Sequence, residues 1–202
     1  MAYKRSPLME ERLAGARERI LLAARERVAA GGYRNAPITA VAAQAGVSTG
    51  LIYRHFPSKA GLFVEVLGAA VEREIRILES IAGRDDPPNE RLRAAISVFV
   101  QRALAGPALA HAFIVEPVDP EVEAERIRGR RRFGHIFRCL VEAGVAAGDL
   151  PAQDAEVTAA CIVGAFTEAL VGPTAPSRQP GRDDAALVEA ICLACLRMAG
   201  AR

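Results

Sequence analysis

Tryptophan is absent from this chain of 202 residues, and aromatic residues make up only 5% of it. Strands favour aromatic and β-branched side chains, whereas the alanine and leucine that dominate here favour helices. We find no segment in which polar and apolar residues alternate as in a half-buried strand, and no repeat or low-complexity tract. Because 51% of the residues are hydrophobic, a buried core is still expected. The composition therefore predicts an all-α protein.

The chain also lacks the signals of export and of membrane insertion. No apolar run follows the basic start at Lys4 and Arg5, so we expect no signal peptide. No apolar run reaches the roughly 18–20 residues of a membrane helix, and no membrane partner is predicted. The expected location is the cytoplasm, where thiols are reduced.

Residues arranged for catalysis or metal binding are missing as well. Cys192 and Cys195 have the spacing of a redox or zinc pair, but they lie in a helical run without a second ligand pair, so we expect them to pack in the core. Cys139 and Cys161 also lie in apolar helical sequence, and His111, Glu116 and His135 lack the spacing of metal ligands. No nucleophile–base pair or phosphate loop is found, so no enzyme, metal or cofactor is predicted.

Lysine is scarce, since it accounts for only two of the 26 basic residues. The charge is also unevenly distributed along the chain. Residues 1–62 carry ten basic and four acidic residues, a net charge of +6, whereas residues 63–202 carry sixteen and twenty, a net charge of −4. A basic segment in front of a mildly acidic body is typical of a protein that contacts DNA at one end.

The pattern of apolar residues and helix breakers predicts a short flexible arm at residues 1–9 and then a series of helices. Pro151 is expected to open the eighth helix, and residues 172–181 are expected to form a loop after it. The expected helices cover residues 10–30, 37–45, 48–55, 58–82, 89–105, 107–115, 121–147, 151–171 and 183–199.

The most informative stretch runs from Val41 to Phe56 and predicts a helix-turn-helix. Gly46 ends the first helix, because glycine adopts the left-handed conformation without a steric cost. Val47 fills the corner between the helices, and Ser48 is a suitable N-cap for the second helix. The small Ala42 lets the two helices approach closely, and the outward residues of the second helix are then free to meet DNA.

Together with the Arg-rich helix before it, this stretch resembles the N-terminal domain of the tetracycline-repressor (TetR) family of bacterial transcription regulators. The resemblance covers about residues 11–63. One departure is Asn35-Ala36-Pro37-Ile38, where the family often has a Ser or Thr cap, so Asn35 or Pro37 is expected to take that role. The matching residues are Gly32-Tyr33, Val41-Ala42, Ala45-Gly46-Val47-Ser48, Gly50, Ile52-Tyr53, His55-Phe56, Lys59 and Leu62-Phe63.

The resemblance implies a three-helix DNA-binding domain at residues 1–57, joined by a long helix to a ligand-binding and dimerisation domain at residues 58–202. Arg54 is the best candidate for reading guanine, whereas Tyr53, His55 and Lys59 suit phosphates. For Tyr53 and His55 a packing role, and for Arg54 a solvated position, stay open as alternatives. The predicted DNA-binding residues are Thr39, Ser48, Thr49, Gly50, Tyr53, Arg54, His55 and Lys59.

For the body, the resemblance implies a homodimer and a pocket for a small molecule. The helices near 153–171 and 183–199 are rich in small apolar residues and suit a dimer interface. The effector is expected to be apolar or amphipathic. The residues that break the Ala/Leu pattern and are candidates for lining the pocket are Phe99, His111, Phe113, Phe137, Cys161, Phe166 and Glu168.

The arginines between Arg126 and Arg132 indicate either a solvated face with ion pairs or one inward arginine that recognises an acidic ligand. The sequence as a whole predicts a ligand-responsive regulator, most simply a repressor that a small molecule releases from a palindromic operator. A sequence-tolerant architectural protein, which would bind all duplexes alike, is the alternative.

Overall fold

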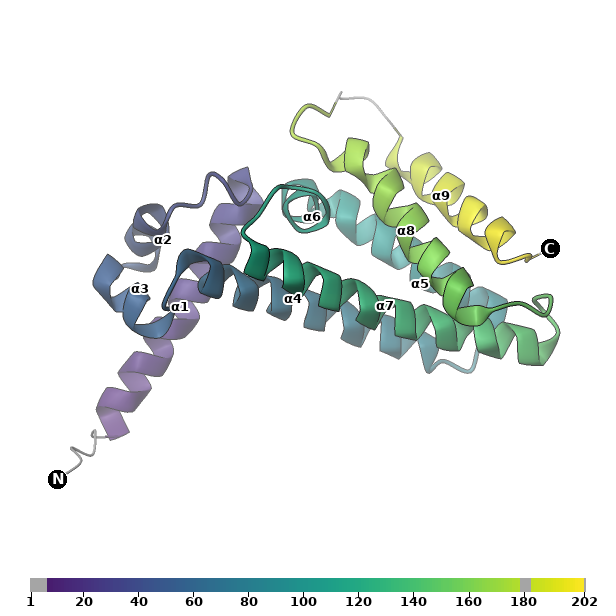
Figure 1. Ribbon diagram of the computed structural model, residues 1–202, viewed down its shortest axis with the longest axis horizontal. Coiled ribbons are helices and arrows are strands. Elements are labelled where there is room, and N and C mark those ends of the chain that lie inside the picture. Colours follow the sequence, from purple (N-terminus) through teal and green to yellow (C-terminus); the bar gives the residue numbers. More distant parts are fainter. Residues whose placement is uncertain (1–6, 179–182, 202) are drawn as a thin grey trace.

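The computed structural model describes residues 7–178 and 183–201, with side chains from Gly15 onward (Figure 1). Within these ranges the chain forms nine helices and no strand, so the predicted all-α fold is confirmed. The helices are α1 (Pro7–Gly31), α2 (Ile38–Ala45), α3 (Thr49–His55), α4 (Lys59–Ala82), α5 (Pro88–Ala105), α6 (Pro107–Ile114), α7 (Pro120–Ala147), α8 (Ala155–Thr174) and α9 (Asp184–Met198).

Helices α1, α2 and α3 form a small unit at one end of the molecule, which we call the head (Figure 1). The inner face of α1 is buried at helical spacing through Ala16, Ile20 and Val28, among others. Helix α1 starts at Pro7 rather than near Glu10, so residues 7–9 are helical and not part of an arm. Residues 1–6, which include Lys4 and Arg5 of the predicted arm, lie outside the described residues.

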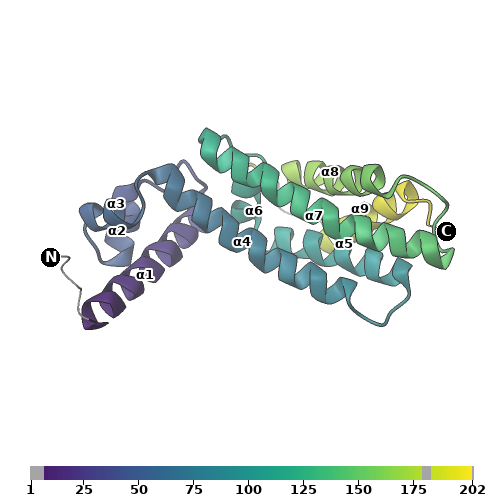
Figure 2. The same ribbon diagram turned by 60° about the horizontal axis from the view of Figure 1, so that its bottom comes forward.

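Helices α4 to α9 form the body. Helix α4 runs from the head into the body and packs along α7, as Figure 2 shows. The two helices approach closely at Gly129, where a Cβ atom would lie only 2.9 Å from Cγ2 of Val71. An aromatic cluster fills the middle of the body, because the ring of Phe99 lies 5.4 Å from that of Phe133 and 4.5 Å from that of Phe166.

Helix α8 differs from the prediction at both ends. It begins at Ala155 and not at Pro151, because the Asp154 carboxylate caps it by accepting hydrogen bonds from the amides of Glu156 and Val157, both at 3.0 Å. It also continues past 171 through Pro173 to Thr174, so the expected loop begins later. Proline removes only one hydrogen bond near a helix end, where the helix is about to stop in any case.

By length and composition, helix α8 is also apolar enough to cross a membrane, with a mean hydropathy of 1.4, although the sequence predicts no apolar run of that length. It packs against α5, α6, α7 and α9 in the body. Even so, only 33% of its most apolar window is buried in the single chain, so much of an apolar helix is left uncovered.

The cysteine prediction is confirmed for Cys192 and Cys195, which are buried and unpaired in the core. Burial raises the pKa of both thiols, to about 11 for Cys195. Cys139 and Cys161 are exposed, which for Cys161 differs from its predicted place in a pocket.

Candidate functional site

The turn between α2 and α3 is built as the sequence predicts. Gly46 is left-handed, with φ of 66°, and the amide of Val47 donates back to the carbonyl oxygen of Ala42 at 3.0 Å. Ser48 then caps α3, because its Oγ accepts a hydrogen bond from the amide of Leu51 at 3.2 Å. The hydroxyl oxygen of Ser48 is therefore already used inside the protein.

Helix α3 has one buried and one exposed face, and Figure 1 shows it at the end of the molecule away from the body. Ile52 is fully buried inside the head, whereas Thr49, Gly50, Tyr53 and Arg54 are exposed. Tyr53 is 51% exposed, so its ring is not a core residue of this chain. Thr39, in the first turn of α2, is also exposed.

Gly50 has no packing reason to be glycine. A Cβ atom added there would meet nothing closer than Oγ of Ser48 at 3.9 Å, and the backbone is ordinary helix. A glycine in an exposed helix costs stability relative to alanine. What it offers is a helix surface on which another molecule can approach the backbone.

His55 and Lys59 face the protein more than the sequence suggested. The Nε2 atom of His55 is buried and has no hydrogen-bond partner among the described residues, which favours the packing alternative at this edge of the ring. The Nζ atom of Lys59 donates to the carbonyl oxygen of Tyr33 at 3.2 Å and lies 4.2 Å from the centre of the Tyr33 ring. Lys59 thus ties the start of α4 to the end of α1.

Asn35 does not cap α2 as predicted. Its Nδ2 donates to the carbonyl oxygen of Gly31 at 2.8 Å, so it caps the end of α1 and not the start of α2. Pro37 occupies the N-cap position of α2 with no side-chain hydrogen bond.

The head is joined to the body by the carboxylate of Glu116, a contact that the sequence does not predict. Oε2 of Glu116, between α6 and α7, accepts a hydrogen bond from the amide of Tyr33 at 2.8 Å, and Oε1 accepts one from Arg34 at 3.1 Å. Gly32 makes room for this contact, because it has a φ of 80° and its Cβ would lie 2.6 Å from Oε2 of Glu116. Both facts require glycine at this position.

Two further side chains complete this joint. The hydroxyl of Tyr33 donates to the Asp119 carboxylate, and burial together with this hydrogen bond raises the pKa of Tyr33. Arg126 is buried and donates to the carbonyl oxygens of Glu116 at 2.7 Å and Ala112 at 3.2 Å. Burial lowers the pKa of Arg126. We refer to Gly32–Arg34, Glu116, Asp119 and Arg126 as the joint.

Protein contacts account for most of the arginine cluster of α7. Arg130 donates to the carbonyl oxygen of Ile114 at 3.0 Å, and Arg131 is the member without a described contact. Arg126 is the one inward arginine, and it is held by the joint and by Glu123 at 2.5 Å. Arg128 pairs with Glu125, and Arg132 pairs with Glu72 of α4 at 2.8 Å. These contacts favour the ion-paired alternative over recognition of an acidic ligand.

The residues predicted to line a pocket are only partly brought together. Phe99, Phe137 and Phe166 meet in the aromatic cluster, where Phe137 and Phe166 are completely buried. His111 and Phe113 lie half-buried on the short α6. Two residues do not face the interior, because Cys161 and Glu168 are exposed on the outer side of α8. Sequence periodicity does not separate the two faces of α8 clearly, because small and apolar residues occur on both of them.

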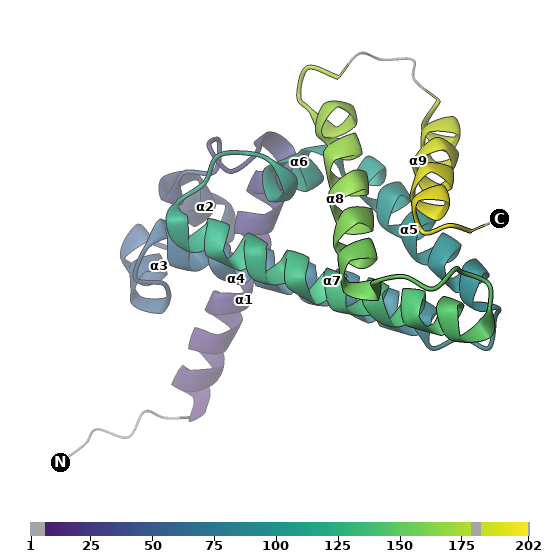
Figure 3. The ribbon, with the colours of Figure 1, turned by 45° about the vertical axis from the view of Figure 1, so that its right-hand side comes forward.

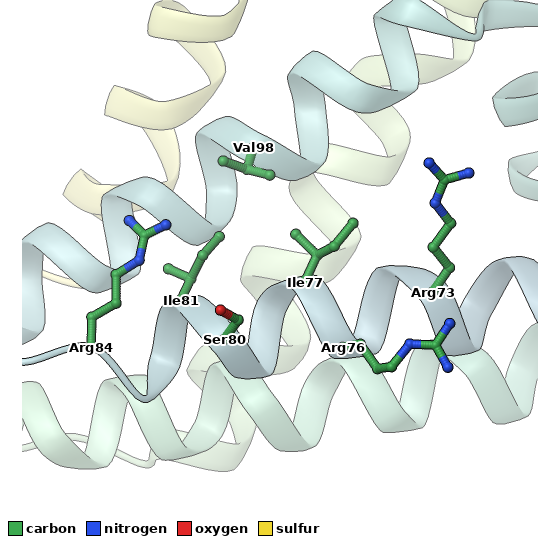
Figure 4. Close-up of a pocket in the computed structure, with 7 residues that line it drawn as sticks. All are labelled: Arg73, Arg76, Ile77, Ser80, Ile81, Arg84 and Val98. Carbon is green, nitrogen blue, oxygen red and sulfur yellow. The ribbon is translucent and has the colours of Figure 1, made fainter.

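A groove lies instead between α4 and α5, where no residue had been predicted to bind a ligand. It has a volume of about 360 Å³, and its lining is drawn in Figure 4. Ile77 and Ile81 of α4 face Val98 of α5, and Arg73 and Arg84 rise on either side of them (Figure 4). Arg76 and Ser80 complete the lining.

The outer faces of α8 and α9 are uncovered and consist mostly of small or apolar residues. The exposed charged residues on these helices are Glu156, Glu168, Glu189 and Arg197. Figure 3 shows the two helices on the side of the body away from the head. Val157 is 57% exposed and Met198 is 45% exposed. Exposed small residues lie between them along the two helices, namely Ala160, Gly164, Ala186, Ala190 and Ala194. Among the described residues no group of His, Cys, Asp and Glu is arranged to hold a metal ion.

Comparison with known proteins agrees with this architecture. The family model described as bacterial regulatory proteins, tetR family, matches residues 20–66, and the model described as tetracyclin repressor-like, C-terminal domain, matches residues 85–170. The chain is 31% identical over 115 residues to the HTH-type transcriptional repressor KstR of Rhodococcus jostii, covering 55% of this chain and 53% of that protein. It is 34% identical over 96 residues to KstR of Mycolicibacterium smegmatis, covering 48% and 47%. The chain thus spans about half the length of these curated relatives.

Solved structures with the same fold cover nearly the whole chain. The fatty acid degradation regulator FadR from Bacillus halodurans has a TM-score of 0.76 at 20% identity and covers 92% of this chain and 99% of its own. The transcriptional regulator FadR from Bacillus subtilis, solved in complex with stearoyl-CoA, has a TM-score of 0.77 at 21% identity with the same coverage. At these identities the likeness establishes the fold.

Proposed function

The chain belongs to the tetR family of bacterial regulatory proteins, and from this premise we propose that it is a ligand-responsive, sequence-specific repressor of transcription. The observation that carries the proposal is the exposed face of α3, in which a capped helix presents Thr49, Gly50, Tyr53 and Arg54 at the end of a basic head. The match to two KstR repressors supports the same function. We take residues 1–57 as the DNA-binding region and residues 58–202 as the effector and dimerisation region.

In this proposal α3 enters the major groove with its N-terminal end. Arg54 reads a guanine edge, Thr49 contacts a base or a phosphate, and Gly50 lets the backbone come close to the DNA. Tyr53 and Thr39 contact phosphates. Lys59 adds positive charge, although its main contact is with Tyr33 inside the head.

We propose that two copies pair through α8 and α9. A short recognition helix reads few bases, and two heads on successive half-sites gain specificity. Support comes from the apolar faces of these helices, since α8 is apolar enough for a membrane span and yet only one third buried in the single chain. Exposed small residues such as Ala160 and Gly164 would allow two such helices to approach closely.

The effector is proposed to act on the body and to reach the head through α4 and the joint. A ligand that binds two arrangements of the body unequally shifts the equilibrium between them, and a coupling of about 1–3 kcal/mol already changes DNA affinity roughly 5- to 150-fold. The stearoyl-CoA bound to FadR from Bacillus subtilis makes an amphipathic acyl compound the first effector to test.

The proposal is tested by capture of sheared genomic DNA on the purified protein at near-physiological salt, followed by sequencing. A few enriched sites that share an inverted repeat are expected, and stearoyl-CoA added to the bound complexes should reduce their retention. Even coverage of the genome in the presence and absence of effector would refute a sequence-specific regulator and favour an architectural DNA-binding protein.

A further inference from the structure

The groove between α4 and α5 combines an apolar floor with unpaired positive charge. Ile77 and Ile81 are buried or half-buried in its floor, facing Val98 across the gap (Figure 4). Its volume of about 360 Å³ is within the range of small-molecule sites, which is about 300–1,000 Å³. A floor of this kind accepts an aliphatic segment.

The arginines of the groove are unlike most others in the body. Among the residues that the structure describes, Arg73, Arg76 and Arg84 make no ion pair and no side-chain hydrogen bond. The carboxylates on either side of Arg73 are engaged elsewhere, because Glu74 binds Arg102 through two hydrogen bonds of 2.7 Å and Glu72 binds Arg132 at 2.8 Å.

The acidic residues that follow do not neutralise these arginines either. Glu79, Asp85 and Asp86 are exposed and make no ion pair within the described part of the chain. Arg73 and Arg76 lie one helical turn apart and repel each other, so an anion beside them is favoured, and Arg84 offers a second guanidinium at the other end of the groove. The charge that the groove lacks is therefore one that a ligand can supply.

We propose that this groove binds an amphipathic anion, with an aliphatic segment on Ile77, Ile81 and Val98 and a phosphate or carboxylate group held at one end by Arg73 or at the other by Arg84. The two arginines are eleven residues apart, which is about 16 Å along the helix axis, so they suit an extended molecule better than a lone inorganic ion. Arg76 lies one turn from Arg73 and adds a third donor on the open side.

Occupancy of the groove has a direct route to the head. Helix α4 carries the groove in its C-terminal half, and its N-terminal end carries Lys59, which contacts Tyr33. A ligand that bridges α4 and α5 fixes the position of α4 relative to the body. An effect of the ligand on DNA binding rests on the proposed function. Binding of the ligand in the groove does not depend on it.

The test is calorimetric titration of the full chain with stearoyl-coenzyme A, stearate and coenzyme A as separate probes. The double variant Arg73→Gln/Arg84→Gln removes two charges and keeps good helix formers. The matched control is Arg25→Gln/Arg131→Gln, which removes two exposed arginines without a described contact. Stearoyl-coenzyme A, which carries several phosphate charges, should bind the groove variant roughly 2- to 30-fold more weakly than the control, as expected for two exposed ion pairs. Stearate has one carboxylate, so its binding should weaken by roughly 1.5- to 5-fold, as expected for one ion pair.

The three probes also identify the anionic group. If the groove variant loses affinity for stearoyl-coenzyme A alone, the arginines bind phosphate. If it also loses affinity for stearate, they bind a carboxylate. Equal affinities of groove variant and control for every probe, or no binding of any probe to the unaltered protein, would overturn the inference. Retention of captured genomic DNA by the same preparations is measured in parallel. This distinguishes a failure of the proposed ligand site from a failure of the proposed DNA-binding function.

Discussion

The Glu116 carboxylate lies 2.8 Å from the backbone nitrogen of Tyr33, although the two residues are 83 positions apart in the chain. This contact joins the body to the last residues before the helix-turn-helix. It uses backbone amides of the head, which every residue except proline has, so no sequence pattern marks its partners. A movement of α6 and α7 would therefore displace the head first at Tyr33 and Arg34.

The joint is expected to stabilise the fold. Glu116→Ala leaves the amides of Tyr33 and Arg34 without their acceptor, and we expect the free energy of unfolding to fall by about 1–3 kcal/mol in urea titrations. Glu121→Ala is the control, because Glu121 is exposed and makes no described side-chain contact. Identical unfolding midpoints for the two variants would contradict this role.

The hydroxyl of Tyr33 predicts a dependence of stability on alkaline pH. Its pKa is raised in the folded protein above the ordinary value of about 10, so its contribution is complete below about pH 10 and is lost as the pH rises further. Tyr33→Phe removes the hydrogen bond to Asp119. Thermal unfolding between pH 8 and 11 should therefore show a steeper alkaline loss for the unaltered protein than for the variant, and parallel curves would count against it.

Gly50 is expected to matter for DNA and not for the fold. Gly50→Ala should raise the stability of the free protein by about 0.4–1 kcal/mol, because the added methyl group meets open space and alanine favours helix. The same methyl group should weaken binding to captured operator fragments. Gly134→Ala is the control, since its Cβ also meets open space but the residue belongs to α7 of the body. Equal DNA affinities of both variants would exclude a close approach at Gly50.

Arg54 and Lys59 are expected to act differently. Arg54→Ala should reduce binding to operator fragments more than to random DNA, because an exposed guanidinium suits base reading. Lys59→Ala should weaken both alike and also lower the unfolding free energy by about 1 kcal/mol, because its contact with Tyr33 is lost. Gel shifts on both DNAs, with unfolding curves, separate the two. A selective loss with Lys59→Ala would reverse the assignment.

The dimer proposal predicts that a charge on the outer face of α8 separates the subunits. Val157→Glu places a carboxylate in the apolar face, and light scattering after size exclusion should give the mass of one chain where the unaltered protein gives two. Leu22→Glu on α1 is the control, since Leu22 is 53% exposed and lies on the head. A dimeric Val157→Glu would place the interface elsewhere.

Local features of the head could be predicted because each rests on residues near in sequence. The stop at Gly46, the cap at Ser48 and the buried Ile52 follow from backbone conformation and helical spacing. Lys59 was assigned to phosphates because periodicity cannot see the ring of Tyr33, which packs beneath it. The exposed position of Cys161 is hard to predict for a related reason, because small and apolar residues occur on both faces of α8.

By itself, the sequence determined the helices, the turn that joins α2 to α3 and the exposed face of α3, because helix periodicity, capping and glycine conformation act within a few residues. Only the tertiary structure decided that Glu116 accepts a hydrogen bond from the amide of Tyr33 and that Arg126 donates to backbone carbonyl oxygens. It also decided that Arg73 and Arg84 lie beside an apolar groove without an ion pair among the described residues. Such contacts depend on which helices pack together, and charges far apart along the chain carry no local signal of their partners.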